Sequence, residues 1–211
     1  MTTEPDSNKT IQRRVHFGIP IYEKKMPAYD THKDAIIARA NAMRDADTGV
    51  RRSNLGGWHS SDILGVPKED PLHPLLVTLL QISTACIRDF EEDRAFNDIH
   101  MTGAWLNINE RGNWNAPHEH LPCTWSGVFY LDAGTLDENA KEIGQDGRIM
   151  FFDPMPLGRE WKRPPCISYT PETGTLLLFP SFLTHMVAPY AGDSPRVSLA
   201  FNLVVERSAK P

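Results

Sequence analysis

The chain has 211 residues, of which 40% are hydrophobic and 23% charged, and its formal net charge is −5. This composition is ordinary for a single globular domain with a sizeable core, and it excludes a wholly disordered chain. The acidic balance also argues against a nucleic-acid-binding protein, whose surface is normally basic.

The cysteines and the apolar segments indicate where the protein works. Cys86, Cys123 and Cys166 form no C-x-x-C pair, and their odd number favours free thiols in a reducing compartment over a disulfide framework. The polar N-terminus contains no signal core, and apolar stretches such as 75–80 are too short to cross a bilayer. We therefore expect a cytoplasmic protein that binds neither membranes nor nucleic acids.

The first half of the chain predicts a strand, two helices and a long loop. In chain order these elements cover residues 15–22 (edge strand), 30–44 (helix), 45–70 (loop) and 74–90 (helix). Asp30 and Thr31 can cap the first helix, and Pro74 suits the first turn of the second. The loop is rich in Gly, Ser, Asn and Asp, and loops of this length in compact domains are usually functional.

The character of the sequence changes beyond residue 97, where β-branched and aromatic residues gather in short segments separated by Gly, Pro and Asp. The segments are 99–109, 124–132, 147–153, 166–170, 174–179, 185–190 and 195–205. Many short strands after two helices predict an antiparallel sandwich or barrel with an N-terminal helical layer. We expect one domain over 1–211, made of a flexible end (1–12), a helical layer with a loop (13–97) and a β core (98–205).

The last predicted strand has two different faces. One face of 196–204 holds Arg196, Ser198, Ala200 and Asn202, and the other holds the apolar residues between them. Small polar residues beside one arginine suit either a solvent-facing surface or the wall of a polar cavity. The segment alone does not decide between these two interpretations.

Three of the eight histidines suggest a metal site, whereas the others, His59 among them, are expected to be surface or packing residues. His118 and His120 project to the same side of an extended segment and can reach one metal ion. His185 opens a later strand, and Arg196 follows it. Because a guanidinium pairs two-pronged with a carboxylate, this set suits a ligand that is chelated at one end and carboxylate-bound at the other.

The order of these motifs resembles the iron(II)- and 2-oxoglutarate-dependent oxygenases, and within them a group of small bacterial and phage oxygenases similar to prolyl hydroxylases. The resemblance rests on 118–131, 150–154, 174–185 and 196–202, with 53–60 as an N-terminal match, and it extends over nearly the whole chain from about residue 15. It implies an α+β, mainly β fold: a double-stranded β-helix, or jelly roll, with the N-terminal helices packed on one sheet.

The resemblance also implies Fe2+, 2-oxoglutarate and O2 as cofactor and cosubstrates, and it assigns residues by position. His118 and His185 match the family's iron-binding histidines. Arg196 and Ser198 match the pair that binds the far carboxylate of 2-oxoglutarate, and Tyr130 matches a tyrosine that donates to the same carboxylate. The implied reaction oxidises, typically hydroxylates, a C–H bond of a small-molecule or peptide substrate and releases succinate and CO2. A homodimer is compatible with this assignment.

Position 120 departs from the family pattern, in which the first motif is H-x-D or H-x-E. Three interpretations follow. His120 is a third neutral ligand, or it lies beside a two-histidine site without binding the metal, or a carboxylate from elsewhere in the chain completes the ligand set. We favour the ligand, because His120 occupies the position of the acid. An imidazole there leaves the metal site one unit more positive, which favours binding of a dianionic cosubstrate.

Trp105, Asn107 and Asn109 share one face of the strand that leads to the histidines. They are candidates for the wall of a substrate pocket, although an ordinary surface face fits them equally well. Two other functions remain open: a three-histidine cupin-type dioxygenase that does not use 2-oxoglutarate, and a non-catalytic metabolite-binding jelly roll. The cupin interpretation leaves Arg196 and Ser198 without a purpose.

Overall fold

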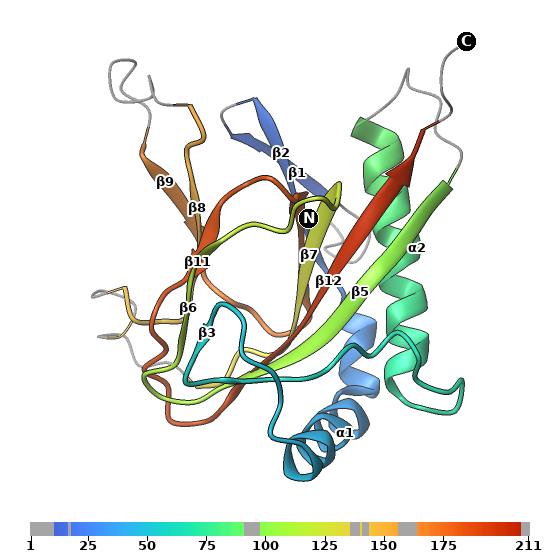
Figure 1. Cartoon of the computed structure of the whole chain (residues 1–211), viewed down its shortest axis with the longest axis vertical. Coiled ribbons are helices and arrows are strands. Elements are labelled where there is room, and N and C mark those ends of the chain that lie inside the picture. Colours follow the sequence, from blue (N-terminus) through green and yellow to red (C-terminus); the bar gives the residue numbers. More distant parts are fainter. Residues whose placement is uncertain are drawn as a thin grey trace, which may run out of the picture.

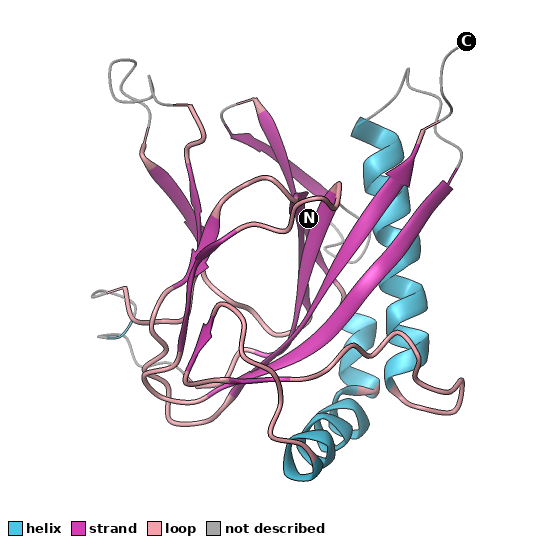
Figure 2. Ribbon diagram, viewed as in Figure 1, coloured by secondary structure: helices cyan, strands magenta, loops and turns pink. Residues whose placement is uncertain are grey.

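A computed structural model describes residues 11–16, 18–90, 98–135, 140, 144–155 and 164–207; the first ten residues of the predicted flexible end lie outside these ranges. Two antiparallel sheets face each other, and the helices cover the outer side of the larger sheet (Figures 1 and 2). The elements are β1 (Gln12–His16), β2 (Ile19–Lys25), η1 (Pro27–Thr31), α1 (Lys33–Ala46), β3 (Asn54–Leu55), β4 (Trp58–His59), α2 (Leu72–Phe90), β5 (Asp98–Asn109), β6 (Trp114–His118), β7 (Trp125–Asp132), β8 (Ile149–Phe152), β9 (Cys166–Tyr169), β10 (Thr175–Pro180), β11 (His185–Val187) and β12 (Arg196–Glu206).

The strand order is that of a double-stranded β-helix. The larger sheet runs β1-β2-β10-β7-β12-β5-β4 and the smaller β3-β6-β11-β8-β9, so that strands far apart in the sequence are neighbours. The pairs between them are antiparallel. The predicted mainly β jelly roll with helices on one sheet is therefore confirmed. The stretch 13–97 supplies strands β1 to β4 to these sheets in addition to its helices.

The two faces of β12 pack against different surroundings. Its apolar residues, Val197, Leu199, Phe201 and Leu203, belong to the core that also contains the buried side of α2. The opposite face therefore points inwards between the sheets, where Arg196, Ser198, Ala200 and Asn202 line a cavity. The sequence left open whether the polar face of β12 is a solvent-facing surface or a cavity wall. Because the helices pack on the outer side of the sheet, the polar face is a cavity wall.

Two local predictions differ from the structure. Asp30 and Thr31 lie in the 3-10 turn η1, so α1 begins after them, at Lys33, and its N-cap residue is His32, whose side chain makes no capping hydrogen bond. Residues 114–118, which lie outside the predicted strand segments, form strand β6, which lies between β3 and β11 in the smaller sheet. Asn115 and Pro117 are residue types that are rare in strands, so the sequence pattern does not indicate a strand here. The register between β6 and β11 is irregular.

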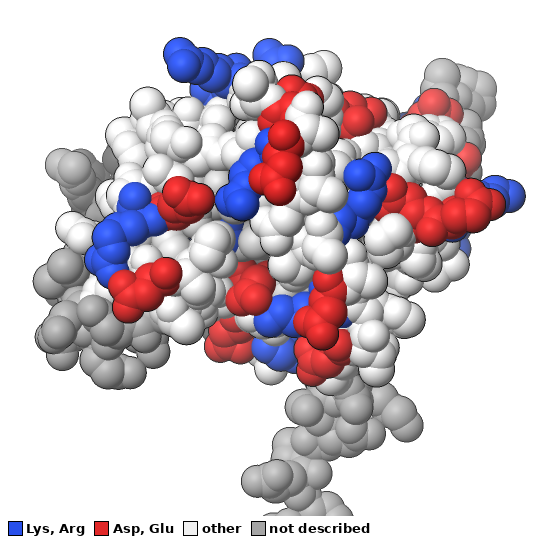
Figure 3. All heavy atoms as spheres, turned by 90° about the horizontal axis from the view of Figure 1, so that it is seen from below, with Lys and Arg blue, Asp and Glu red and all other residues white. Residues whose placement is uncertain are grey.

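The outer surface carries mixed charge. On the face seen in Figure 3, acidic and basic side chains are interspersed, and neither sign forms a continuous patch among the coloured residues. Among the described helices, none combines the length and the hydropathy that a membrane-spanning helix needs. Cys86, Cys123 and Cys166 are free thiols.

Candidate active site

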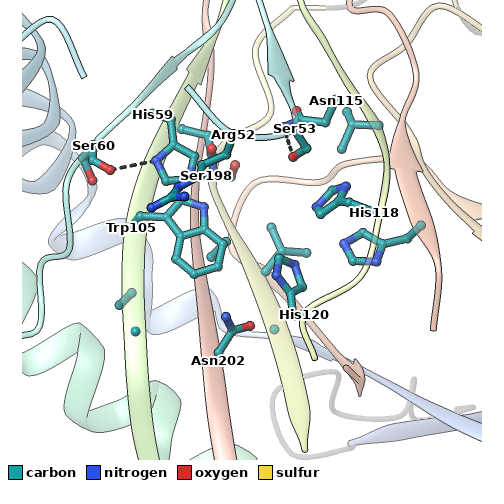
Figure 4. Close-up of a pocket in the computed structure, with 18 of the residues that line it drawn as sticks. Arg52, Ser53, His59, Ser60, Trp105, Asn115, His118, His120, Ser198 and Asn202 are labelled. Carbon is teal, nitrogen blue, oxygen red and sulfur yellow. Dashed lines mark hydrogen bonds between the residues drawn. The ribbon is translucent and has the colours of Figure 1, made fainter. Parts of the chain in front are cut away.

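A cavity of about 870 Å³ opens between the two sheets. The larger sheet contributes the polar face of β12 and parts of β5 and β7, and the smaller sheet contributes β6 and β11. Figure 4 shows His118 and His120 on one wall, facing His59 and Trp105 on the other, with Asn202 between them at one end. Polar side chains from both sheets therefore line the same cavity.

Three histidines meet in this cavity. His185 of β11 pairs directly across the sheet with His118 of β6, and their ring centroids are 4.3 Å apart. His120 follows β6, and its ring lies 5.0 Å from His118 and 5.2 Å from His185. One potential ligand atom from each residue lies within 4.8 Å of the others. The cluster can therefore surround a single ion.

Backbone carbonyls fix the orientation of two of these rings. His118 Nδ1 lies 2.7 Å from the carbonyl oxygen of Ala116, and His185 Nδ1 lies 2.9 Å from that of Leu183. A carbonyl only accepts, so Nδ1 carries the proton in each ring and the Nε2 lone pair is free to bind a metal. Both rings therefore have the tautomer that a metal ligand requires.

Burial also keeps the three rings neutral. Burial lowers the pKa of His118, that of His120 to about 4 and that of His185 to about 3. For His120 and His185, repulsion by His118 in its protonated form lowers the pKa further. Neutral imidazoles can offer lone pairs to a metal ion, whereas protonated ones cannot. The donor set therefore fits a divalent transition metal such as Fe2+.

Arg196 lies in the same cavity as a buried cation. Arg196 is only 2% exposed, and its Nε is buried without a hydrogen-bond partner. Burial lowers its pKa, because the charged form loses hydration. Within the described ranges it forms no ion pair, so an anionic ligand group would supply the missing counter-charge.

Ser198 and Tyr130 stand beside this arginine. They face each other directly across β12 and β7, and both are buried and line the cavity. Burial raises the pKa of Tyr130 to about 12, so its phenol keeps the proton that it can donate. The structure thus brings together a guanidinium and two hydroxyl groups, which is a donor set suited to a carboxylate.

The three predicted residues of β5 have different positions. Trp105 and Asn107 line the cavity. Asn109 does not; it is 1% exposed and its Oδ1 accepts a hydrogen bond from Arg196 Nη2 at 3.0 Å. Asn109 therefore lies behind the arginine instead of on the cavity wall.

The loop before α2, which its length marks as functional, contributes cavity residues that the sequence pattern did not single out. His59, expected to be a surface or packing residue, lines the cavity and stacks on Trp105, with ring centroids 5.3 Å apart. Arg52 and Ser53 line it too. Pairing of β3 with β6 and of β4 with β5 places this loop over the cavity. The signals in the sequence were the length and polar composition of the loop and the resemblance of residues 53–60 to the oxygenase family.

Comparisons with known proteins agree with this geometry. Residues 103–202, which include the three histidines and Arg196, match the family described as "Putative 2OG-Fe(II) oxygenase". No significant match was found among curated proteins.

Solved structures show the same fold. A prolyl-4-hydroxylase from Pseudomonas putida is 17% identical, with a TM-score of 0.59, over 94% of this chain and 93% of that one. HygX from Streptomyces hygroscopicus, with nickel, 2-oxoglutarate and hygromycin B bound, is 11% identical, with a TM-score of 0.59, over 86% and 82%. A prolyl hydroxylase from Trichoplax adhaerens, in complex with a hypoxia-inducible-factor peptide, is 13% identical, with a TM-score of 0.57, over 85% and 83%.

At such low identities these likenesses establish the fold, while the match over residues 103–202 concerns the sequence that contains the site. The match and the fold together indicate a 2OG-Fe(II)-dependent oxygenase, with Fe2+ as cofactor and 2-oxoglutarate as cosubstrate.

Proposed function

We propose that the protein hydroxylates a C–H bond of a small polar molecule or a peptide, at the expense of 2-oxoglutarate and O2. His118, His120 and His185 would hold Fe2+ through imidazole nitrogens, and Arg196 with Ser198 would bind the far carboxylate of 2-oxoglutarate. The main support is the buried, unneutralised Arg196 in the same cavity as three imidazoles that meet at one point.

The contribution of the chain is binding, orientation and exclusion of water. The bound ferrous ion supplies the oxidising chemistry, in which substrate, 2-oxoglutarate and O2 become hydroxylated substrate, succinate and CO2. Tyr130 would donate its phenolic proton to the cosubstrate carboxylate, since its raised pKa keeps it protonated. Phe151 and Phe179, which pack on His185, keep water from that side of the ligand cluster.

The substrate end of the cavity is polar. Its lining includes an aromatic platform, Trp105 with His59 stacked on it, and several hydroxyl, amide and charged groups. The similar structures hold hygromycin B in one case and a peptide in another. A polar small molecule or a peptide segment is therefore the substrate class that we propose.

Succinate formation tests this function directly. We expect the purified protein to convert 2-oxoglutarate slowly to succinate even without a prime substrate, and only when Fe2+ and O2 are present. Oxygen uptake is measured with and without 2-oxoglutarate. Uptake that needs iron but not 2-oxoglutarate would favour the cupin-type dioxygenase, and no turnover with any addition would favour a metabolite-binding jelly roll.

The role of His120 has its own test. We expect His120→Asp to keep Fe2+ binding, because a carboxylate is also a metal ligand, and His120→Ala to weaken it by about tenfold or more. Because the carboxylate makes the site one unit less positive, His120→Asp should also weaken 2-oxoglutarate binding. Metal content after dialysis is measured for each variant. Unchanged iron affinity in His120→Ala would place His120 outside the ligand set.

A further inference from the structure

Arg196 is held in place by uncharged groups. Its Nη1 donates to the carbonyl oxygen of Gly147 at 2.5 Å, and its Nη2 donates to Oδ1 of Asn109 at 3.0 Å. A guanidinium has five N–H donors, so the two contacts leave three, among them the buried and unpartnered Nε. The side chain is therefore fixed in direction without being neutralised.

The carboxylate whose charge acts on Arg196 is already paired. Asp146 is fully buried, and Arg148 donates to its two oxygens at 2.7 and 2.9 Å. Thr170 donates to one of these oxygens as well, at 3.2 Å. The negative charge of Asp146 is thus balanced by Arg148, which leaves the charge of Arg196 available.

The amide at position 109 is built into the sheet. Asn109 lies directly opposite Arg196 in the register of β5 and β12. A Cβ on Gly57 would come within 2.7 Å of Asn109 Nδ2, so the glycine allows the loop to approach and enclose the amide. An aspartate has nearly the same shape, and at this position it would form a buried ion pair with Arg196.

We propose that Asn109 is a positioning residue, which orients the Arg196 guanidinium through a neutral acceptor and so reserves its charge for the far carboxylate of 2-oxoglutarate. This inference rests on the proposed function, in which Arg196 binds that carboxylate. It explains why a buried arginine is paired with an amide in a chain that has 27 acidic residues. Neutralisation from within the protein would compete with the cosubstrate.

The test compares two keto acids on the Fe2+-loaded protein, by calorimetric titration without oxygen. 2-Oxopentanoate has the same chain length as 2-oxoglutarate but lacks the far carboxylate. We expect Asn109→Asp to raise the dissociation constant of 2-oxoglutarate by about tenfold or more and to leave that of 2-oxopentanoate unchanged. The ligand-free variant should melt about 2 °C or more above the wild type, because the buried charge gains a counter-charge.

Opposite effects on stability and on cosubstrate affinity separate this role from a merely structural one. Asn109→Ala, which removes the acceptor, is expected to lower the melting temperature and to weaken 2-oxoglutarate binding about threefold, again without affecting 2-oxopentanoate. Asn113→Asp is the matched control: it makes the same chemical change outside the cavity, at a residue whose Oδ1 accepts from the backbone of Glu110. It should change neither affinity.

The outcomes also separate this inference from the function on which it rests. If Asn109→Asp and Asn109→Ala weaken both keto acids equally, or neither, while Arg196→Met loses 2-oxoglutarate selectively, the positioning role of Asn109 is wrong and the assignment of Arg196 stands. If Arg196→Met itself binds 2-oxoglutarate like the wild type, the assignment of the cosubstrate site is wrong.

Discussion

Replacing His185 with alanine is expected to abolish Fe2+ binding and all 2-oxoglutarate turnover. His185 is 4% exposed and lies directly opposite His118, with its Nδ1 proton directed to a carbonyl and its other nitrogen free. Loss of a group that merely orients a ligand costs about 10- to 100-fold in metal affinity, so loss of the ligand itself should exceed about 100-fold. Equilibrium dialysis with metal quantification measures the change.

His59→Ala is the matched control for this experiment. His59 is a histidine of the same cavity, but it stacks on Trp105 and does not belong to the three-residue cluster. We expect its iron affinity to stay within about twofold of the wild type. Thermal unfolding shows whether each variant is folded. A folded His185→Ala protein that binds Fe2+ as the wild type does would show that the three imidazoles are not the metal site.

The parts of the fold that local pattern determines could be predicted from the sequence. The apolar spacing over 74–90 predicts a helix, and α2 spans Leu72–Phe90. The alternation in 196–204 predicts a strand with one polar and one apolar face, and β12 has these faces. Both patterns report burial, and burial is what the sequence periodicity of a regular element reflects.

The parts that depend on distant strand pairing could not be predicted in the same way. Strand β6 contains Asn115 and Pro117, and it is a strand because β11 and β3 pair with it. His59 enters the cavity because β4 pairs with β5, and the resemblance of residues 53–60 to the oxygenase family does not by itself assign a role to this histidine. Asn109 is the last residue of β5 on the face that Trp105 and Asn107 share, and it contacts Arg196 instead of lining the cavity.

The most selective effect on the cosubstrate is expected for Arg196→Met. Methionine is apolar and flexible enough to fill the space, and it removes a buried charge that has no counter-ion among the described residues, so the fold should persist. Loss of one partner from a buried, hydrogen-bonded charge pair costs about 2 kcal/mol or more, which corresponds to roughly 30-fold or more in the dissociation constant of 2-oxoglutarate.

Two further measurements make the Arg196→Met result specific. Fe2+ affinity should not change, because the three histidines lie on other strands or loops, and the affinity for 2-oxopentanoate should not change, because that acid has no far carboxylate. Arg196→Lys keeps the charge but loses the planar fork, so it should fall between the wild type and Arg196→Met. Equal weakening of both keto acids in Arg196→Met would mean that Arg196 shapes the cavity as a whole, and the far carboxylate would then have to bind elsewhere in it.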